Sequence, residues 1–150
     1  NITIDPKEKM YKNWISEILS NLNTKIDEKQ LRELIKSAGK SHYEYLQMDQ
    51  LLAPYIGNLN KFTRFIEKEW GWIFSYEENG KILIADENKS YCVCPLLNQH
   101  KTDKLPALCY CSEGFAEMMF SKVNKTPVKA TIISSIQRGN DKCVYKIHLP

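Results

Sequence analysis

Apolar residues in the first half of the chain recur with the period of helices. Between Met10 and Leu22 they lie three or four residues apart, with polar residues in the positions between them, which predicts a first helix. The same spacing in residues 61–70 predicts another helix, which ends before Gly71. The chain is therefore expected to begin with a block of helices.

Residues typical of helix ends divide the stretch between these two helices. Asp27, with a glutamine three residues later, predicts the start of a second helix, and Gly39 is a residue type that commonly ends one. Ser41, with a glutamate three residues later, repeats the start pattern. A third helix is therefore expected from Ser41 to about Leu52, ahead of Pro54.

After the fourth helix the pattern changes to the short, alternating runs that are typical of strands. Residues 72–76 and 81–85 are β-prone, and the Asn79-Gly80 turn between them favours a hairpin. Residues 91–94 form a third candidate strand, which ends at a proline.

The C-terminal part predicts a further helix and a second hairpin. Ser112 is expected to cap a helix that continues to about Val123, and residues 128–137 and 142–148 are expected to pair. Together the elements predict an α+β fold, with N-terminal helices packed on an antiparallel sheet built from two hairpins with one intervening helix. We expect residues 1–150 to form a single α+β domain, because no repeat, linker or low-complexity segment interrupts them.

Composition and charge exclude several classes of partner. Apolar residues make up 43% of the 150 positions, which is enough for a packed core. The formal net charge is +3, too small to indicate a nucleic-acid partner or an anionic membrane surface. No apolar run approaches the roughly 18 residues that a membrane-spanning helix requires. We therefore expect neither a nucleic-acid nor a membrane partner.

The five cysteines are placed unevenly, as two Cys-x-Cys pairs that begin at Cys92 and Cys109 and a last cysteine near the C-terminus. Residues i and i+2 of a strand face the same side, so both thiols of a pair would point at one place. Four thiolates suit a tetrahedral zinc site, and the candidate ligands are Cys94, Cys109, Cys111 and Cys143. Two alternatives stay open: the thiols are ordinary core residues, or one of them is reactive. The expected cofactor is zinc or none.

Cys111 is the candidate catalytic nucleophile. It directly precedes Ser112, where the unpaired backbone N–H groups of a helix start would lower the pKa of a thiol. His42, His100 and His148 are the candidate bases, although each is more often an ordinary packed or surface histidine.

Aromatic residues near the junction of helices and sheet are the candidate ligand-binding residues. Trp72, Tyr76 and Tyr110 would line an apolar pocket there, although such residues belong more often to the core.

The C-terminal part of the chain carries the segments CYCSEGF at 109–115, Pro-Val at 127–128 and RGNDKCVY at 138–145. It resembles the end of the 4-vinyl-reductase-type small-molecule-binding domains, which occur in bacterial regulators that sense aromatic compounds. It is equally similar to the bacterial proteins related to L-2-amino-thiazoline-4-carboxylic acid hydrolase. The first resemblance implies ligand binding, and the second implies hydrolysis of small cyclic amides or amidines.

The resemblance also implies a zinc site, from which this sequence departs. In the aromatic-sensing domains zinc is held by a Cys, a Glu and two further Cys, and Cys109 and Cys143 occupy the first and last of these positions. Ile132 and Ser135 stand at the other two, and neither is a good zinc ligand. The resemblance still implies that Cys109 and Cys143 approach each other.

We therefore expect a small-molecule-binding, sensor-like domain of unknown ligand, with a cysteine cluster near the C-terminal hairpin. The alternative is a hydrolase of small cyclic amides or amidines that uses Cys111 or a Cys-bound zinc, so whether the protein is an enzyme stays undecided. A third hypothesis is an interaction domain, and a homodimer stays open beside the small-molecule ligand. The odd number of cysteines favours a reducing cytoplasm, although the sequence begins at Asn1 and a removed signal peptide stays open.

Overall fold

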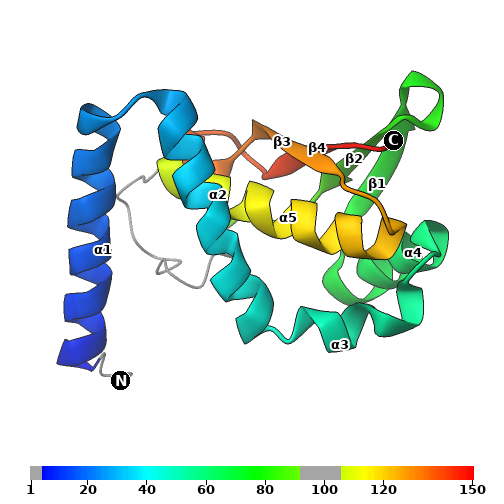
Figure 1. Cartoon of the computed structure of the whole chain (residues 1–150), viewed down its shortest axis with the longest axis horizontal. Coiled ribbons are helices and arrows are strands. Elements are labelled where there is room, and N and C mark those ends of the chain that lie inside the picture. Colours follow the sequence, from blue (N-terminus) through cyan, green and yellow to red (C-terminus); the bar gives the residue numbers. More distant parts are fainter. Residues whose placement is uncertain (1–4, 92–105) are drawn as a thin grey trace.

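A computed structural model describes residues 5–91 and 106–150 and has the α+β architecture that the sequence predicts (Figure 1). Its helices are α1 (Pro6–Lys25), α2 (Glu28–Tyr45), α3 (Met48–Leu52), α4 (Leu59–Trp70) and α5 (Cys109–Asn124). Its strands are β1 (Ile73–Glu77), β2 (Ile82–Asp86), β3 (Lys129–Ser134) and β4 (Val144–His148). Within the described ranges, none of these helices combines the length and the apolar character needed to cross a membrane.

The first helix is confirmed, but only part of its apolar stripe is buried. Leu19 lies in the core, and Ile15 packs partly against it. Trp14 is 63% exposed and Met10 is 55% exposed, because α1 lies at one side of the molecule and contacts it through one face (Figure 1).

The second helix begins as the sequence predicts and ends later. The Asp27 carboxylate accepts a hydrogen bond from the Gln30 N–H, as expected for a helix cap. The helix then continues through Gly39 to Tyr45, so the predicted helix end at Gly39 and the predicted separate helix from Ser41 are both wrong.

Gly39 serves the packing of α2 on α5 instead of ending a helix. A Cβ atom at Gly39 would lie 2.6 Å from the Cys111 carbonyl oxygen, and a Cβ atom at Gly114 would lie 2.0 Å from the Lys36 carbonyl oxygen. The two helices therefore cross with their backbones in contact, which only glycine permits at these two positions.

The sheet has the strand order β1-β2-β4-β3, and every neighbouring pair is antiparallel. The two predicted hairpins, β1–β2 and β3–β4, are confirmed, and the pairing of β2 with β4 joins them into one sheet. Asn79 and Gly80 adopt positive φ angles of 56° and 84° in the first turn, as their sequence predicts. Of the third candidate strand, Tyr91 lies in no strand, and residues 92–94 lie outside the described residues.

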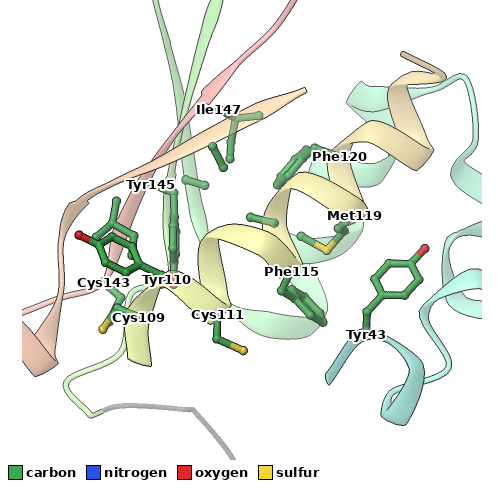
Figure 2. Packing of buried hydrophobic residues seen from close by; sticks show 14 of the residues in the cluster. Tyr43, Cys109, Tyr110, Cys111, Phe115, Met119, Phe120, Cys143, Tyr145 and Ile147 are labelled. Atoms are coloured by element: carbon green, nitrogen blue, oxygen red, sulfur yellow. The ribbon is translucent and has the colours of Figure 1, made fainter. Parts of the chain in front are cut away.

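Helix α5 lies between the sheet and α2 and forms the centre of the core (Figure 1). Figure 2 shows Phe120 of this helix near Ile147 of β4, and Phe115 on the side of the helix that faces Tyr43 of α2. Alternate residues of β4 face the helix, as the sequence pattern indicates, and Ile147 is fully buried there. The helix begins at Cys109, after a 3₁₀ turn over Pro106–Leu108, so the prediction that Ser112 caps it is wrong.

Candidate functional site

The described residues form an apolar cavity of about 480 Å³ at one end of α5. The last turn of α2 contributes His42, and the end of α4 contributes Trp70. Phe115 of α5 and Tyr145 of β4 also line it, as does Trp72, which lies just before β1. Small-molecule sites usually measure about 300–1,000 Å³ and have mainly apolar walls, so this cavity has the size and lining of a ligand site.

The two tryptophans reach the cavity because the chain reverses between them. Gly71 ends α4 with a φ angle of 74°, and its N–H donates to the Glu67 carbonyl oxygen. This left-handed glycine cap brings Trp70 and Trp72 to the same side, with ring centroids 5.6 Å apart. The Trp72 ring is also stacked beside Tyr145, at 6.4 Å and an interplanar angle of 16°.

A buried glutamate that follows β2 lines the cavity. Glu87 is 6% exposed, and its Oε1 accepts a hydrogen bond of 2.8 Å from the Tyr145 hydroxyl. Burial raises the pKa of the Glu87 carboxyl, whereas the Tyr145 hydrogen bond and Lys89 oppose this effect. Burial also raises the pKa of Tyr145, so its hydroxyl keeps its proton and remains a donor.

Cys111 lies where this cavity meets a second one. The second cavity, of about 560 Å³, lies between α1, α2 and the start of α5, and His42, Tyr45 and Cys111 line both. Burial raises the pKa of the Cys111 thiol and lowers the pKa of His42, so both side chains are held in their neutral forms. Within the described residues, the Cys111 thiol forms no hydrogen bond to a base, so the structure contains no nucleophile–base pair at this position.

The raised pKa of Cys111 is opposite to the sequence expectation, and the helix geometry explains part of the difference. Cys111 lies inside the first turn of α5 instead of before it, and its thiol is buried against apolar neighbours. The desolvation of the thiolate then outweighs the effect of the helix start.

The three predicted ligand-binding residues lie in different places. Trp72 lines the cavity. Tyr76 is 47% exposed on β1 and lies away from the cavity lining. The guanidinium groups of Arg32 and Arg138 lie over the Tyr110 ring, at 5.3 Å and 4.9 Å from its centroid, and the Tyr110 hydroxyl donates to Glu28.

The predicted metal ligands do not form a common site within the described part of the chain. Cys109 and Cys111 lie two residues apart on a helix, where side chains point in different directions, and Figure 2 shows their sulfur atoms directed away from each other. The Cys109 sulfur lies 2.7 Å from the Ser135 hydroxyl, and Cys143 is buried nearby at the start of the last strand. Among residues 5–91 and 106–150, no three ligand-type side chains come together around one point, and Cys94 lies outside these ranges.

The three histidines predicted as candidate bases do not lie together either. His42 lines both cavities and lies in the last turn of α2, not in the opening turn of a helix. His148 contacts the Thr131 hydroxyl at 3.1 Å on the sheet, and His100 lies outside the described residues.

Glu87 is a residue of the site that the sequence does not predict. A glutamate that follows a strand is usually a surface residue, and nothing in its local sequence distinguishes it from one. Tyr145 carried a partial signal, because it alternates with buried residues on β4 and so had to face the helices.

Comparison with known proteins shows the fold and the family of the chain. No curated protein matches it. Among solved structures, it is similar to a trafficking protein particle complex subunit 3 from Naegleria fowleri covalently bound to palmitic acid, with a TM-score of 0.53 and 8% sequence identity. That alignment covers 96% of this chain and 95% of the other, and at such low identity it shows the fold alone. The model of the family described as a family of unknown function (DUF6144) matches residues 3–150, and the chain therefore belongs to this family.

Proposed function

We propose that this protein binds a small, mainly apolar molecule in the cavity at the end of α5. The observation that carries the proposal is a cavity of about 480 Å³ whose walls include the rings of Trp72, Phe115 and Tyr145. A few polar groups, among them Glu87, also line it. Such an arrangement gives affinity through the apolar walls and orientation through the polar groups.

Binding without catalysis fits the described residues better than hydrolysis does. A thiol nucleophile needs a lowered pKa or an adjacent base. Burial instead raises the pKa of Cys111, and His42 is held neutral without a hydrogen bond to that thiol. We therefore propose a binding domain, in agreement with the sensor-like function that the sequence analysis favours.

Binding of a fluorescent apolar probe tests the proposal. N-phenyl-1-naphthylamine becomes bright in apolar surroundings, and we expect a saturable increase of its fluorescence on titration with the protein. Palmitic acid, which the Naegleria fowleri protein carries, serves as one competitor among apolar molecules of different length.

Two aromatic substitutions locate the bound probe. Trp72→Ala removes a wall of the cavity and is expected to weaken binding about tenfold or more, because a buried aromatic contact contributes on the order of 1.5 kcal/mol or more. Tyr76→Ala is the matched control, because this exposed tyrosine on the next strand lies away from the lining. Circular dichroism checks that both variants fold. Unsaturable fluorescence, or equal losses in the two variants, would contradict the proposal.

A further inference from the structure

The lining of the cavity includes a carboxyl group with unused hydrogen-bonding capacity. One oxygen of Glu87 accepts from Tyr145, at 2.8 Å. No group in the described part of the chain donates to its other oxygen, although the side chain is only 6% exposed and lines the cavity. A molecule that enters the cavity therefore meets a hydrogen-bond acceptor that the protein has left available.

The positive charge near Glu87, that of Lys89, has another partner. The Lys89 ammonium group donates a 2.8 Å hydrogen bond to the Trp70 carbonyl oxygen, at the end of α4. Within the described ranges, no cationic side chain lies within 4 Å of the Glu87 carboxylate. A buried carboxylate without a cationic partner is costly, so a ligand that supplies the positive charge gains the interaction that the protein omits.

The walls of the cavity favour the same kind of ligand. The rings of Trp70, Trp72 and Tyr145 line the same cavity as the carboxyl group, and the electron-rich faces of such rings attract cations. A second carboxylate, that of Glu69, lies in the lining where α4 ends. The lining thus holds two carboxylates and one ammonium group, that of Lys89, which already donates to the Trp70 carbonyl oxygen, so an anionic ligand would meet more negative than positive charge.

We propose that the cavity recognises a small amine, with an apolar body between the aromatic walls and a protonated amino group paired with Glu87. The inference rests on the ligand-binding function proposed above and adds the chemical class of the ligand. The buried position of Glu87 agrees with it, because burial raises the pKa of this carboxyl in the empty cavity and a bound cation would reverse that effect.

Three probes with the same apolar body test the class of ligand. Isothermal titration calorimetry at pH 7.5 compares n-octylamine, octan-1-ol and octanoate, which are positive, neutral and negative. We expect octylamine to bind about tenfold or more tightly than octanol, since an ion pair and a cation–π contact in a partly desolvated site together exceed about 1.4 kcal/mol. Octanoate is expected to bind most weakly.

A matched pair of substitutions connects the preference to one carboxyl group. Glu87→Gln keeps the shape of the side chain and an acceptor for Tyr145, and it is expected to abolish the advantage of octylamine over octanol. Glu67→Gln is the control, because Glu67 is exposed on α4 and lies away from the cavity lining. It is expected to preserve the advantage.

The outcomes separate this inference from the proposed function. If octanol binds as tightly as octylamine, or octanoate binds best, the cavity takes apolar ligands but the amine inference is overturned. If octylamine keeps its advantage in a folded Glu87→Gln protein, the inference is also overturned. If none of the three binds and the naphthylamine probe does not saturate, the proposed function itself fails. The comparison of ligands on the unaltered protein decides the question even when a variant does not fold.

Discussion

At the scale of single residues, the character of the site depends on which side chains are buried, and sequence patterns reveal this only in part. Trp72 was predicted as a ligand-binding residue and does line the cavity. Tyr110 was predicted on the same grounds, yet its ring contacts two arginines, one of which is separated from it by more than half of the chain. Glu87 was not predicted, because its partners, Tyr145 and the Cys143 carbonyl oxygen, lie far away in the sequence. The local sequence shows which side chains could form a site, whereas contacts between distant segments decide which of them do.

Glu87 gives a prediction for the pH dependence of stability. Burial raises the pKa of its carboxyl above the ordinary value of 4.5. Below that pH the carboxyl is protonated and neutral in both the folded and the unfolded state, so it does not lower the stability of the fold. As the pH rises, the unfolded carboxyl ionises first, so the wild-type protein loses stability until the folded carboxyl ionises as well.

The Glu87→Gln variant is therefore expected to gain stability relative to the wild type between about pH 4.5 and the raised pKa, by at most about 1.4 kcal/mol for each pH unit. Urea unfolding at pH 4 and at pH 7.5 measures the free energy of unfolding of both proteins. The exposed Glu67→Gln variant is the control and should follow the wild type. A relative loss of stability in Glu87→Gln as the pH rises would show that the carboxylate form stabilises the fold.

At the scale of elements, the sequence predicted the types of the helices and strands better than their ends. The first hairpin was predicted closely, because its Asn79-Gly80 turn is a local signal. The end of α2 was misplaced, because Gly39 looks like a helix end and is in fact a contact with α5. Such a glycine is distinguished only by the helix that crosses it, which lies far away in the sequence.

The crossing of α2 and α5 predicts an unusual sign for a glycine substitution. In the interior of a helix, Gly→Ala normally stabilises by about 1 kcal/mol. At Gly114 the added methyl group would lie 2.0 Å from the Lys36 carbonyl oxygen, so the helices must move apart. Gly114→Ala is therefore expected to destabilise the protein by about 3 kcal/mol, at the upper end for overpacking of a core.

Chemical denaturation followed by circular dichroism measures this change. Ser37→Ala is a suitable control, because Ser37 is exposed on α2 and an alanine there is expected to be neutral or slightly stabilising. A Gly114→Ala protein as stable as the wild type would mean that the two helices do not cross at this distance.

At the scale of the whole molecule, a network of ion pairs connects the helical layer with the edge of the sheet. Glu113 of α5 is 1% exposed and accepts two hydrogen bonds from Arg32 of α2, at 2.8 and 2.7 Å. The same carboxylate accepts the Ile132 N–H of β3, at 2.8 Å. One turn later, Glu117 accepts from Lys36 and from the Ala130 N–H. The two carboxylates thus accept backbone N–H groups that the edge strand β3 does not use within the sheet, and they connect α2 and α5 to this strand.

This network predicts that one buried carboxylate matters more than any exposed ion pair of the protein. Glu113→Gln keeps the size of the side chain but leaves the buried part of Arg32 without its charged partner, and we expect a loss of about 3 kcal/mol in the free energy of unfolding. Glu44→Gln removes a carboxylate from an exposed pair with Lys40 and is expected to cost less than about 0.5 kcal/mol. Equal small losses in both variants, measured by urea unfolding, would show that the connection between the helices and β3 depends on apolar packing instead. A loss confined to Glu113→Gln would show that this carboxylate holds the layer of helices on the sheet.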